Sequence, residues 1–452
     1  MGEITILVVG LFVLLLLAFV FSEYDFFSPS FIICAVFAFG SLLALYATVS
    51  WGIPDDVFSS TATWIMLSGT LVFIICEQFT RRIILPKRKK KIIIENITES
   101  RPIHIPRVKM VILVVICIAG TGLYVLGVYQ KVRANGYSGG FNLGEIAVFN
   151  HKLSFRDDVE GGISRIVSIL QSVAKLAMYM SMYTFFNNVV CCREKITRNL
   201  IYFVPVITWV PNVLVTSSRG SYLQIAGAVV FFYYIAISRR NHWMQMKRNY
   251  RKLVRYASVF FVAILGAFYG AAATGVIGRQ TDKTFLDSIT IYLGAPIIHF
   301  HQFMTSPPND VMYFGQETFN KMLPLFNRLG FVEGTVTGQL EMRNITSLYR
   351  GNVYTFFRRP YHDFGLWGMY IVVAMTAIVF SYVYYGRIYG RYQSYKNDRI
   401  LILYSYFFYI IYIFSVDNAL YLYVYPSIVF FLISSYVLYA FLFGKIKFRI
   451  KG

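Results

Sequence analysis

The chain has 452 residues, of which 57% are hydrophobic and only 14% are charged, and its formal net charge is +21. Apolar runs of about 18 residues or more recur from one end to the other, which excludes an ordinary soluble globular protein and indicates a polytopic helical membrane protein. The positive charge does not indicate a nucleic-acid partner, because membrane proteins concentrate Lys and Arg in their cytoplasmic loops.

The hydropathy pattern predicts an all-α polytopic membrane protein with about eleven transmembrane helices, within a range of about ten to twelve. We expect residues 1–452 to form a single integral membrane domain. The first apolar run lacks a basic leader and a small-residue cleavage site, so we expect a retained helix rather than a signal peptide. In chain order the predicted spans are Ile4–Phe21, Phe31–Val49, Thr61–Phe79, Val111–Tyr129, Ile163–Val190, Leu200–Val215, Tyr222–Ile237, Leu253–Ala272, Phe364–Tyr385, Ile400–Phe414 and Leu420–Phe443.

The loop between the third and fourth predicted spans sets the expected orientation. Residues 81–109 are dense in Lys and Arg, which predicts a cytoplasmic loop. Three spans precede this loop, so the N-terminus is expected outside and, with eleven spans, the C-terminus in the cytoplasm. The other basic loops, at Arg193–Arg198, Arg239–Arg255 and Arg387–Arg399, then fall on the same side.

Two predicted external regions are too long to be simple turns. One covers residues 130–162, and the other covers residues 276–362, far beyond an ordinary connection. The second contains an apolar piece, Ile289–Phe303, that is too short to span easily and carries Pro296. This piece predicts short re-entrant or interfacial helices in the large external loop.

Arginines in the external regions are the first candidates for chemistry. Arg219 sits in a hydroxyl-rich break between two apolar runs, and isolated charge at the edge of a membrane tends to mark a site. A snorkelling interfacial arginine is the alternative interpretation. Arg279 and Arg350 belong to the large external loop, where arginine outnumbers lysine. The planar guanidinium suits phosphate oxygens, so these residues predict a phosphate or pyrophosphate site.

The segment from Arg358 to Gly365 combines two arginines, a proline, aromatic rings and a His-Asp pair at the mouth of a span. His362 or Asp363 could serve as a general base for a sugar hydroxyl, and Arg358 and Arg359 could neutralise a departing pyrophosphate. An interfacial aromatic belt with a capping aspartate is the structural alternative.

Other polar residues do not favour a metal or cofactor site. His299 and His301 are two residues apart and would point in different directions on a helix, and the five cysteines form no CxxC. We therefore expect no metal and no cofactor. The external acidic residues cannot be ranked from the sequence; they are Asp157, Asp158, Glu317, Glu333 and Asp417, the last explained by an ordinary helix cap.

With this layout and these motifs, the chain resembles the oligosaccharide repeat-unit polymerases, the Wzy family of O-antigen, capsule and exopolysaccharide assembly. The resemblance is strong in layout and rests on short motifs. These are Ser217-Ser218-Arg219-Gly220, Gly278-Arg279, Tyr292-Leu293-Gly294-Ala295-Pro296, Asn352-Val353-Tyr354-Thr355, Arg359-Pro360-Tyr361-His362-Asp363-Phe364-Gly365 and Gly368.

The resemblance implies a metal-independent glycosyltransferase in the bacterial inner (plasma) membrane, with its active site facing the periplasm or cell exterior. It would join polyprenyl-pyrophosphate-linked oligosaccharide repeat units, donor to acceptor, into a surface polysaccharide. Membrane lipids, a chain-length regulator and a flippase are the further partners implied, and nucleic acid is not. In this hypothesis His362 or Asp363 activates the acceptor hydroxyl. The residues expected to bind substrate and pyrophosphate are Arg219, Arg279, Arg350, Arg358, Arg359, Tyr292 and Tyr361.

Two alternatives remain open. An O-antigen ligase has a similar layout and chemistry but a different acceptor, and a ligase mutant would still make lipid-linked polymer. A flippase or exporter of lipid-linked glycan would need charges within its spans lining a passage, whereas Lys175 is nearly the only such residue in the predicted spans.

Overall fold

The computed structural model describes residues 2–85, 100–153, 156, 159–216, 219–243, 284–308, 313–332, 340–346 and 349–444, with only the backbone of Arg219 and Phe285. The predicted span Leu253–Ala272 lies outside these residues. The described chain is mostly helical and divides into two compact units. Unit 1 comprises Met1–Lys89, Asp282–Tyr389 and Phe407–Pro426, and unit 2 comprises Lys90–Thr281, Gly390–Tyr406 and Ser427–Gly452.

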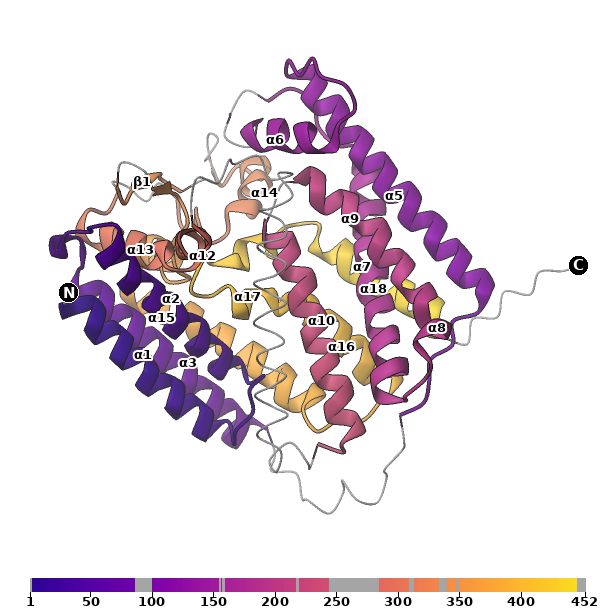
Figure 1. Ribbon diagram of the computed structural model, residues 1–452, viewed down its shortest axis with the longest axis horizontal. Helices are drawn as coiled ribbons and strands as arrows, with labels where there is room; N and C mark the ends of the chain where they lie inside the picture. Colours follow the sequence, from indigo (N-terminus) through magenta and orange to yellow (C-terminus); the bar gives the residue numbers. More distant parts are fainter. Residues whose placement is uncertain are drawn as a thin grey trace, which may run out of the picture. The chain divides into compact units, whose positions relative to one another are not determined.

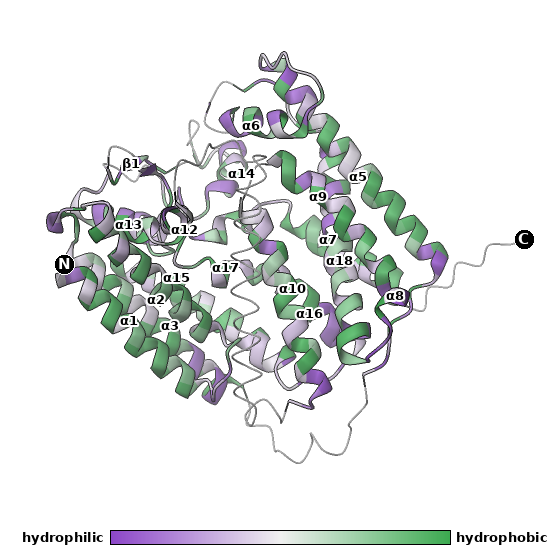
Figure 2. Cartoon of the chain, in the orientation of Figure 1, coloured by the Kyte–Doolittle hydropathy of each residue, from purple (hydrophilic) through white to green (hydrophobic). Residues whose placement is uncertain are grey.

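Eight helices in the described residues are long and apolar enough to cross a membrane. Their cores are α1 (Gly2–Phe21), α2 (Pro29–Ser50), α3 (Ser60–Phe79), α5 (Arg107–Ala134), α7 (Arg165–Phe186), α9 (Val204–Thr216), α10 (Arg219–Arg240) and α15 (Arg358–Val383). Apolar residues run along most of the length of α1, α3 and α5, and polar residues gather at helix ends and in loops (Figure 2). The prediction of a multi-pass helical membrane protein is thus confirmed, while the count of eleven and the orientation stay predictions.

Helices α1, α2, α3 and α15 pack together to form the helical body of unit 1 (Figure 1). Each carries large apolar side chains on its outward face; Leu16, Trp64 and Ile371 are exposed in this way. In a soluble protein such faces would be unusual, but lipid tails cover them at no cost. Three of the long helices end in π-helical turns, η2 (Thr80–Ile84), η3 (Asn187–Cys191) and η7 (Tyr384–Ile388).

Unit 1 also holds a buried carboxylate inside the predicted span Thr61–Phe79. Glu77 on α3 is fully buried and accepts hydrogen bonds from the hydroxyls of Ser28 and Ser30, at 2.8 and 2.7 Å, and from the Ser30 N–H at 2.8 Å. Tyr385 donates a further bond at 3.3 Å. These bonds tie the start of α2 and the end of α15 to α3.

The predicted short helices of the large external loop are present as α12 (Phe285–Leu293) and α13 (Ala295–Thr305). Gly294 separates them, because a Cβ there would lie 2.9 Å from the α2 backbone at Leu43 and Ala44. The rest of the loop contains η6 (Asn320–Met322), α14 (Leu323–Arg328), and the antiparallel pair β1 (Arg343–Asn344) and β2 (Arg350–Gly351). The short helix η1 (Asp55–Val57), on the α2–α3 connection, contacts α13.

The two histidines of α13 anchor different loops. The Nδ1 atom of His299 lies 2.9 Å from the Val353 carbonyl oxygen, and the Nδ1 atom of His301 lies 3.1 Å from the Ser59 nitrogen. Burial lowers the pKa of each imidazole to about 4, so both are neutral at pH 7. They fix α13 against the chain segments that lead to α3 and α15.

In unit 2, α7 packs against α5, α9, α10 and α18 (Ile428–Phe443). The short helix α6 (Leu143–Leu153), between α5 and α7 in the chain, packs on α5 and α9 around a small apolar cluster that includes Val132, Ile146 and Val215. The shorter elements of this unit are α8 (Ile196–Asn199), η4 (Leu200–Phe203) and α16 (Tyr395–Phe407).

Two predicted spans near the C-terminus differ from the structure. The predicted span Ile400–Phe414 is interrupted at Phe408, between α16 and α17 (Tyr409–Tyr412). The predicted span Leu420–Phe443 contains η8 (Ala419–Leu422) and then the shorter helix α18. Tertiary contact accounts for the first difference, because the Phe414 ring stacks on Phe356 with 3.7 Å between centroids, and the Phe414 carbonyl accepts from the Phe356 N–H at 2.9 Å.

Candidate functional site

The candidate site is built on the first turns of α15, which a glycine separates from the apolar helix that follows. Gly365 has φ 67° and ψ −168°, a backbone conformation open essentially to glycine alone. The turn from Arg358 to Phe364 is therefore a short helical segment of its own. Its polar side chains contact the loop that carries Glu317 and Glu341 and the turn after α17.

Arg358 is the centre of a buried ion-pair network. Its side chain is 0% exposed. One terminal nitrogen, Nη1, donates to Glu317 Oε2, and the other, Nη2, donates to Glu341 Oε2 at 2.6 Å. The guanidinium also lies over the rings of Phe303 and Tyr354, 4.5 and 5.2 Å from their centroids. Aromatic faces and carboxylates together offset the desolvation of this cation.

Arg359 is held in a second way. Its Nε atom lies 3.4 Å from Asp417 Oδ1, and its Nη1 atom donates to the Glu317 carbonyl oxygen at 3.3 Å. The guanidinium carbon stands 4.1 Å from the centroid of the Tyr421 ring. Arg359 therefore connects the start of α15 to the chain between α17 and η8.

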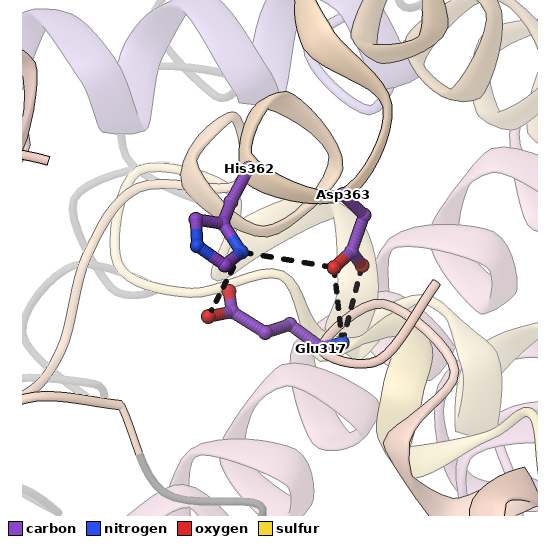
Figure 3. Close-up of side chains that lie close together, drawn as sticks. All are labelled: Glu317, His362 and Asp363. Atoms are coloured by element: carbon purple, nitrogen blue, oxygen red, sulfur yellow. Dashed lines mark hydrogen bonds and ion pairs between the residues drawn. The ribbon is translucent and has the colours of Figure 1, made fainter. Parts of the chain in front are cut away.

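Glu317, His362 and Asp363 come together beside Arg358 (Figure 3). The Nδ1 atom of His362 lies 3.3 Å from Glu317 Oε1 and 3.8 Å from Asp363 Oδ1. The Asp363 carboxylate accepts the backbone N–H of Glu317 at 3.2 Å and the N–H of Thr318 at 2.6 Å. Asp363 thus fixes the loop that presents Glu317, which favours a positioning role over the predicted role as a base.

The glycine before this loop explains its sharp turn. Gly315 has φ 75°, and a Cβ at this position would lie 2.6 Å from the Phe319 ring. The Phe319 N–H donates to the Gly315 carbonyl at 2.8 Å, which closes the turn around Glu317. A larger residue would strain the backbone and push Phe319 away.

The two glutamates that share Arg358 have opposite pKa shifts. Burial raises the pKa of Glu317, and the opposing effect of Arg358 and His362 does not cancel it. Burial also acts on Glu341, but there Arg358, a backbone hydrogen bond and Arg343 outweigh it and lower its pKa. A carboxyl with a raised pKa, close to an imidazole, is the group expected of a general base.

The two arginines at the start of α15 are less accessible than the carboxylates that pair with them. The Arg358 and Arg359 side chains are 0% and 5% exposed, whereas those of Glu317, Asp417 and Glu341 are 14%, 21% and 27% exposed. A ligand approaching Arg358 or Arg359 would therefore meet these carboxylates first. This arrangement suits activation of a hydroxyl better than capture of a phosphate.

A metal ion is a further chemical option for Glu317, His362 and Asp363, whose ligand atoms lie within 4.8 Å of one another. Two contacts argue against it. Arg358 already pairs with Glu317, so a divalent cation would face a fixed positive charge. Two backbone N–H groups already occupy the Asp363 carboxylate, which draws its electron density away from a metal.

The remaining predicted site residues are distributed as follows. Tyr361 lies on the same turn as Arg358, edge-on to Phe303 with 6.2 Å between centroids. Arg350 on β2 has an exposed side chain, and Tyr292 is half-buried on α12. The backbone of Arg219 begins α10 in unit 2, but its side chain lies outside the described atoms, and Arg279 lies outside the described residues, as do Asp157, Asp158 and Glu333.

Three contributors to the network were missed or left unranked in the sequence. Glu317 was one acidic residue among several, Glu341 was not singled out, and Asp417 was explained as a helix cap. In the structure the cap of η8 is Asn418, whose side chain accepts the Leu420 N–H at 3.0 Å, and this leaves Asp417 for Arg359. No short-range signal marks these residues, because Glu317 and Arg358 are 41 positions apart.

No protein-family model matches the chain, and neither a curated protein nor a solved structure matches it. The chemistry of the candidate site therefore rests on the geometry of this chain alone.

Proposed function

We propose that the protein is a membrane glycosyltransferase that polymerises polyprenyl-pyrophosphate-linked oligosaccharide repeat units into a surface polysaccharide, with its site on the outer face of the bacterial inner membrane. The observation that carries the proposal is the Glu317–His362–Arg358 cluster at the start of the apolar helix α15. It combines a partly accessible carboxyl of raised pKa with buried cations, next to a helix apolar enough to contact a lipid tail.

Glu317 is the general base in this proposal. The acceptor hydroxyl oxygen attacks the anomeric carbon of the donor, the bond from that carbon to the pyrophosphate oxygen breaks, and the hydroxyl proton passes to the Glu317 carboxylate. The lipid pyrophosphate leaves with the electron pair of the broken bond. His362, 3.3 Å from Glu317, orients the carboxylate and takes a share of the proton.

The cations of the cluster have an electrostatic role in the proposal. Arg358 keeps Glu317 in place, and Arg359 carries positive charge towards the leaving pyrophosphate, together with the exposed Arg350. Asp363 and Gly315 hold the loop. Direct binding of pyrophosphate by Arg358 would require displacement of Glu317 or Glu341, so we assign that role to Arg359 and Arg350 instead.

The decisive test is polymerisation by the purified full chain. Lipid-linked repeat units, extracted from cells that lack the gene, are incubated with the protein, with and without a chelator of divalent cations. We expect a ladder of lengthened lipid-linked products under both conditions. Glu317→Gln should reduce the rate by about 10²- to 10⁴-fold, the usual contribution of a general base.

A matched control separates chemistry from folding. Glu160→Gln makes the same change at an exposed glutamate of unit 2 and should leave the ladder unchanged. A ladder of native intensity with Glu317→Gln would refute Glu317 as the base. Two results together would refute the polymerase itself: the purified native chain gives no ladder, and cells that lack the gene still make long polymer.

A ligase or a flippase would give different results in the same cells. Loss of a ligase leaves long polymer on the lipid carrier, and loss of a flippase leaves single repeat units on the cytoplasmic face. The partly exposed carboxylates of the cluster favour a transferase over a flippase, because passage of a glycan requires no residue of raised pKa.

A further inference from the structure

An open surface pocket with several polar residues in its lining adjoins the Arg358 network in unit 1. Its volume is about 360 Å³, and it is lined by Asp56, Val57, Gln302, Thr305, Ser306, Arg343 and Asn344. Three elements supply these residues: η1, the C-terminal end of α13, and β1. Arg343 links the pocket to the network, because its Nη2 atom lies 3.2 Å from Glu341 Oε1 while Arg358 holds the other oxygen of the same carboxylate.

The wall of the pocket is rigid on one side. Arg343 donates from Nη1 to the Gln302 carbonyl at 2.8 Å, from Nη2 to the Ser306 carbonyl at 2.5 Å, and from Nε to the Tyr354 hydroxyl at 3.1 Å. The Gln302 side chain donates to the Asn344 carbonyl at 2.9 Å. These bonds clamp β1 onto the end of α13.

One polar atom in this wall is left without a partner. Gln302 Oε1 is buried and accepts no hydrogen bond from the described residues. An unsatisfied buried acceptor costs about 1–3 kcal/mol. Gln302 lines the pocket, so a rotation of its amide that brings this oxygen to a donor in the pocket would be stabilising. The Asp56 and Asn344 side chains are exposed and add further acceptors and donors at the rim.

The lining discriminates between classes of ligand. The guanidinium of Arg343 is already paired with Glu341, whereas Asp56 brings a carboxylate, so the pocket disfavours phosphates and other anions. With one carboxylate in its lining it is also poorly suited to a divalent cation. Hydroxyl groups both donate and accept, and they match a wall of amides, hydroxyls, a guanidinium and a carboxylate.

The size of the pocket agrees with this chemistry. Its volume of about 360 Å³ lies within the range of about 300–1,000 Å³ that is usual for small-molecule sites, so one hexose ring with its hydroxyls fits. Val57 supplies the apolar contact that the C–H face of such a ring requires.

We propose that this pocket binds one uncharged hexose unit of the glycan substrate, beside the catalytic cluster. The inference rests on the proposed function in one respect, namely that the sugar belongs to a glycan whose hydroxyl is activated by Glu317. Arg343, Glu341 and Arg358 form a continuous chain of ion pairs from the pocket to Glu317, so occupancy of the pocket is communicated to the carboxylate through charge.

Saturation-transfer NMR on the purified full chain in detergent micelles tests the pocket directly. The probes are glucose, galactose and N-acetylglucosamine, with glucuronate at equal concentration as the charged comparison. We expect signal transfer to at least one uncharged sugar and less to glucuronate. Gln302→Leu should weaken binding of the uncharged sugar about tenfold, the loss of about one well-placed hydrogen bond.

Asp56→Asn is the second variant, and it changes an exposed residue of η1. It should remove the discrimination against glucuronate and retain binding of the uncharged sugar. Gln130→Leu, at an exposed glutamine of unit 2, is the matched control and should bind as the native chain does. Thermal unfolding midpoints report whether each variant is folded.

The outcomes separate this inference from the proposed function. Sugar binding that is lost in Gln302→Leu, without any polymer ladder, would support the pocket and refute the polymerase. If the native chain produces a ladder, the proposed function is supported, and the pocket is overturned by any of three binding results. These are that no uncharged sugar binds, that Gln302→Leu binds as tightly as the native chain, or that glucuronate binds best.

Discussion

Two buried arginines, one in each unit, are neutralised in very different ways. In unit 2, Arg239 on α10 pairs with Asp398 on α16 at 2.9 Å, donates to the Tyr183 hydroxyl at 3.1 Å, and both charged side chains are nearly inaccessible, at 2% and 4% exposure. In unit 1, Arg358 is fully buried but its two glutamate partners are partly exposed. The first arrangement is a closed pair, and the second has an acidic face.

The difference distinguishes Arg239, whose ion pair has only a structural role, from Arg358, whose partly exposed partners are suited to a site. A closed pair is complete, so any ligand would disrupt it. Around Arg358, the carboxylates Glu317, Glu341, Asp363 and Asp417 outnumber the arginines Arg343, Arg358 and Arg359. Burial raises the pKa of Glu317, and the neighbouring Asp363 carboxylate acts in the same direction.

The largest expected effect on stability is in the closed pair. Arg239→Met leaves Asp398 buried without its cation and should cost about 3–5 kcal/mol of unfolding free energy. Denaturation of the purified chain from mixed micelles measures it. The double variant Arg239→Met/Asp398→Leu should recover most of that loss. A single variant as stable as the native chain would show that the pair is not the closed unit inferred above.

The next effect sharpens the distinction between Asp363 and Glu317. Asp363→Ala removes the acceptor for two backbone N–H groups and should cost about 1–3 kcal/mol. Asp363→Asn keeps one carbonyl oxygen for the N–H of Thr318 and should retain most of the polymerisation rate. If Asp363→Asn folds normally yet is as inactive as Glu317→Gln, Asp363 is the base and Glu317 is not.

Gly365 gives a smaller effect that depends on backbone conformation alone. A Cβ there would meet no heavy atom within 4 Å, so Gly365→Ala should cost about 1–2 kcal/mol through strain at φ 67°. Gly122→Ala on α5 is the matched control; it also has free space, lies within a regular helix, and should be neutral or slightly stabilising. Equal stability of the two variants would contradict the break in α15.

The smallest effect concerns pH. A raised pKa in the folded state means that the protonated Glu317 stabilises the fold at low pH, and that this contribution is lost as pH rises through the raised value, while base catalysis is gained over the same range. In Glu341→Gln, Arg358 keeps Glu317 as its only glutamate partner, so its positive charge stabilises the Glu317 carboxylate more strongly. The acid limb of the rate profile should therefore move to lower pH; an upward shift would contradict the sharing of Arg358.

The sequence was sufficient for the class of fold and for the region of the site. Runs of apolar residues report lipid exposure directly, because each residue contributes independently of its distant neighbours. The cluster at Arg358–Asp363 could be located for a similar reason, since its residues are adjacent. The predicted span Phe364–Tyr385 begins next to the break at Gly365, where the apolar part of α15 starts. The helical turn from Arg358 to Phe364 was not predicted, because its polar residues carry no hydropathy signal.

The roles inside the site could not be assigned from the sequence. Whether Arg358 faces a ligand or the interior depends on Glu317 and Glu341, which are 41 and 17 residues away. Glu77 illustrates the same limit, since its burial is explained by Ser28, Ser30 and Tyr385, all far from it along the chain. Pairings of this kind arise only when the chain folds back on itself.

The joint at Gly365 also has a mechanical consequence. Membrane helices tilt to match the local thickness of the bilayer, and a continuous helix would transmit that rotation to any group at its end. In this protein the lipid-facing part of α15 can change its inclination about the glycine, while the contacts of Arg358 and Asp363 keep the preceding turn in register with its loop. The groups of the candidate site would thereby be insulated from variation in the membrane around them.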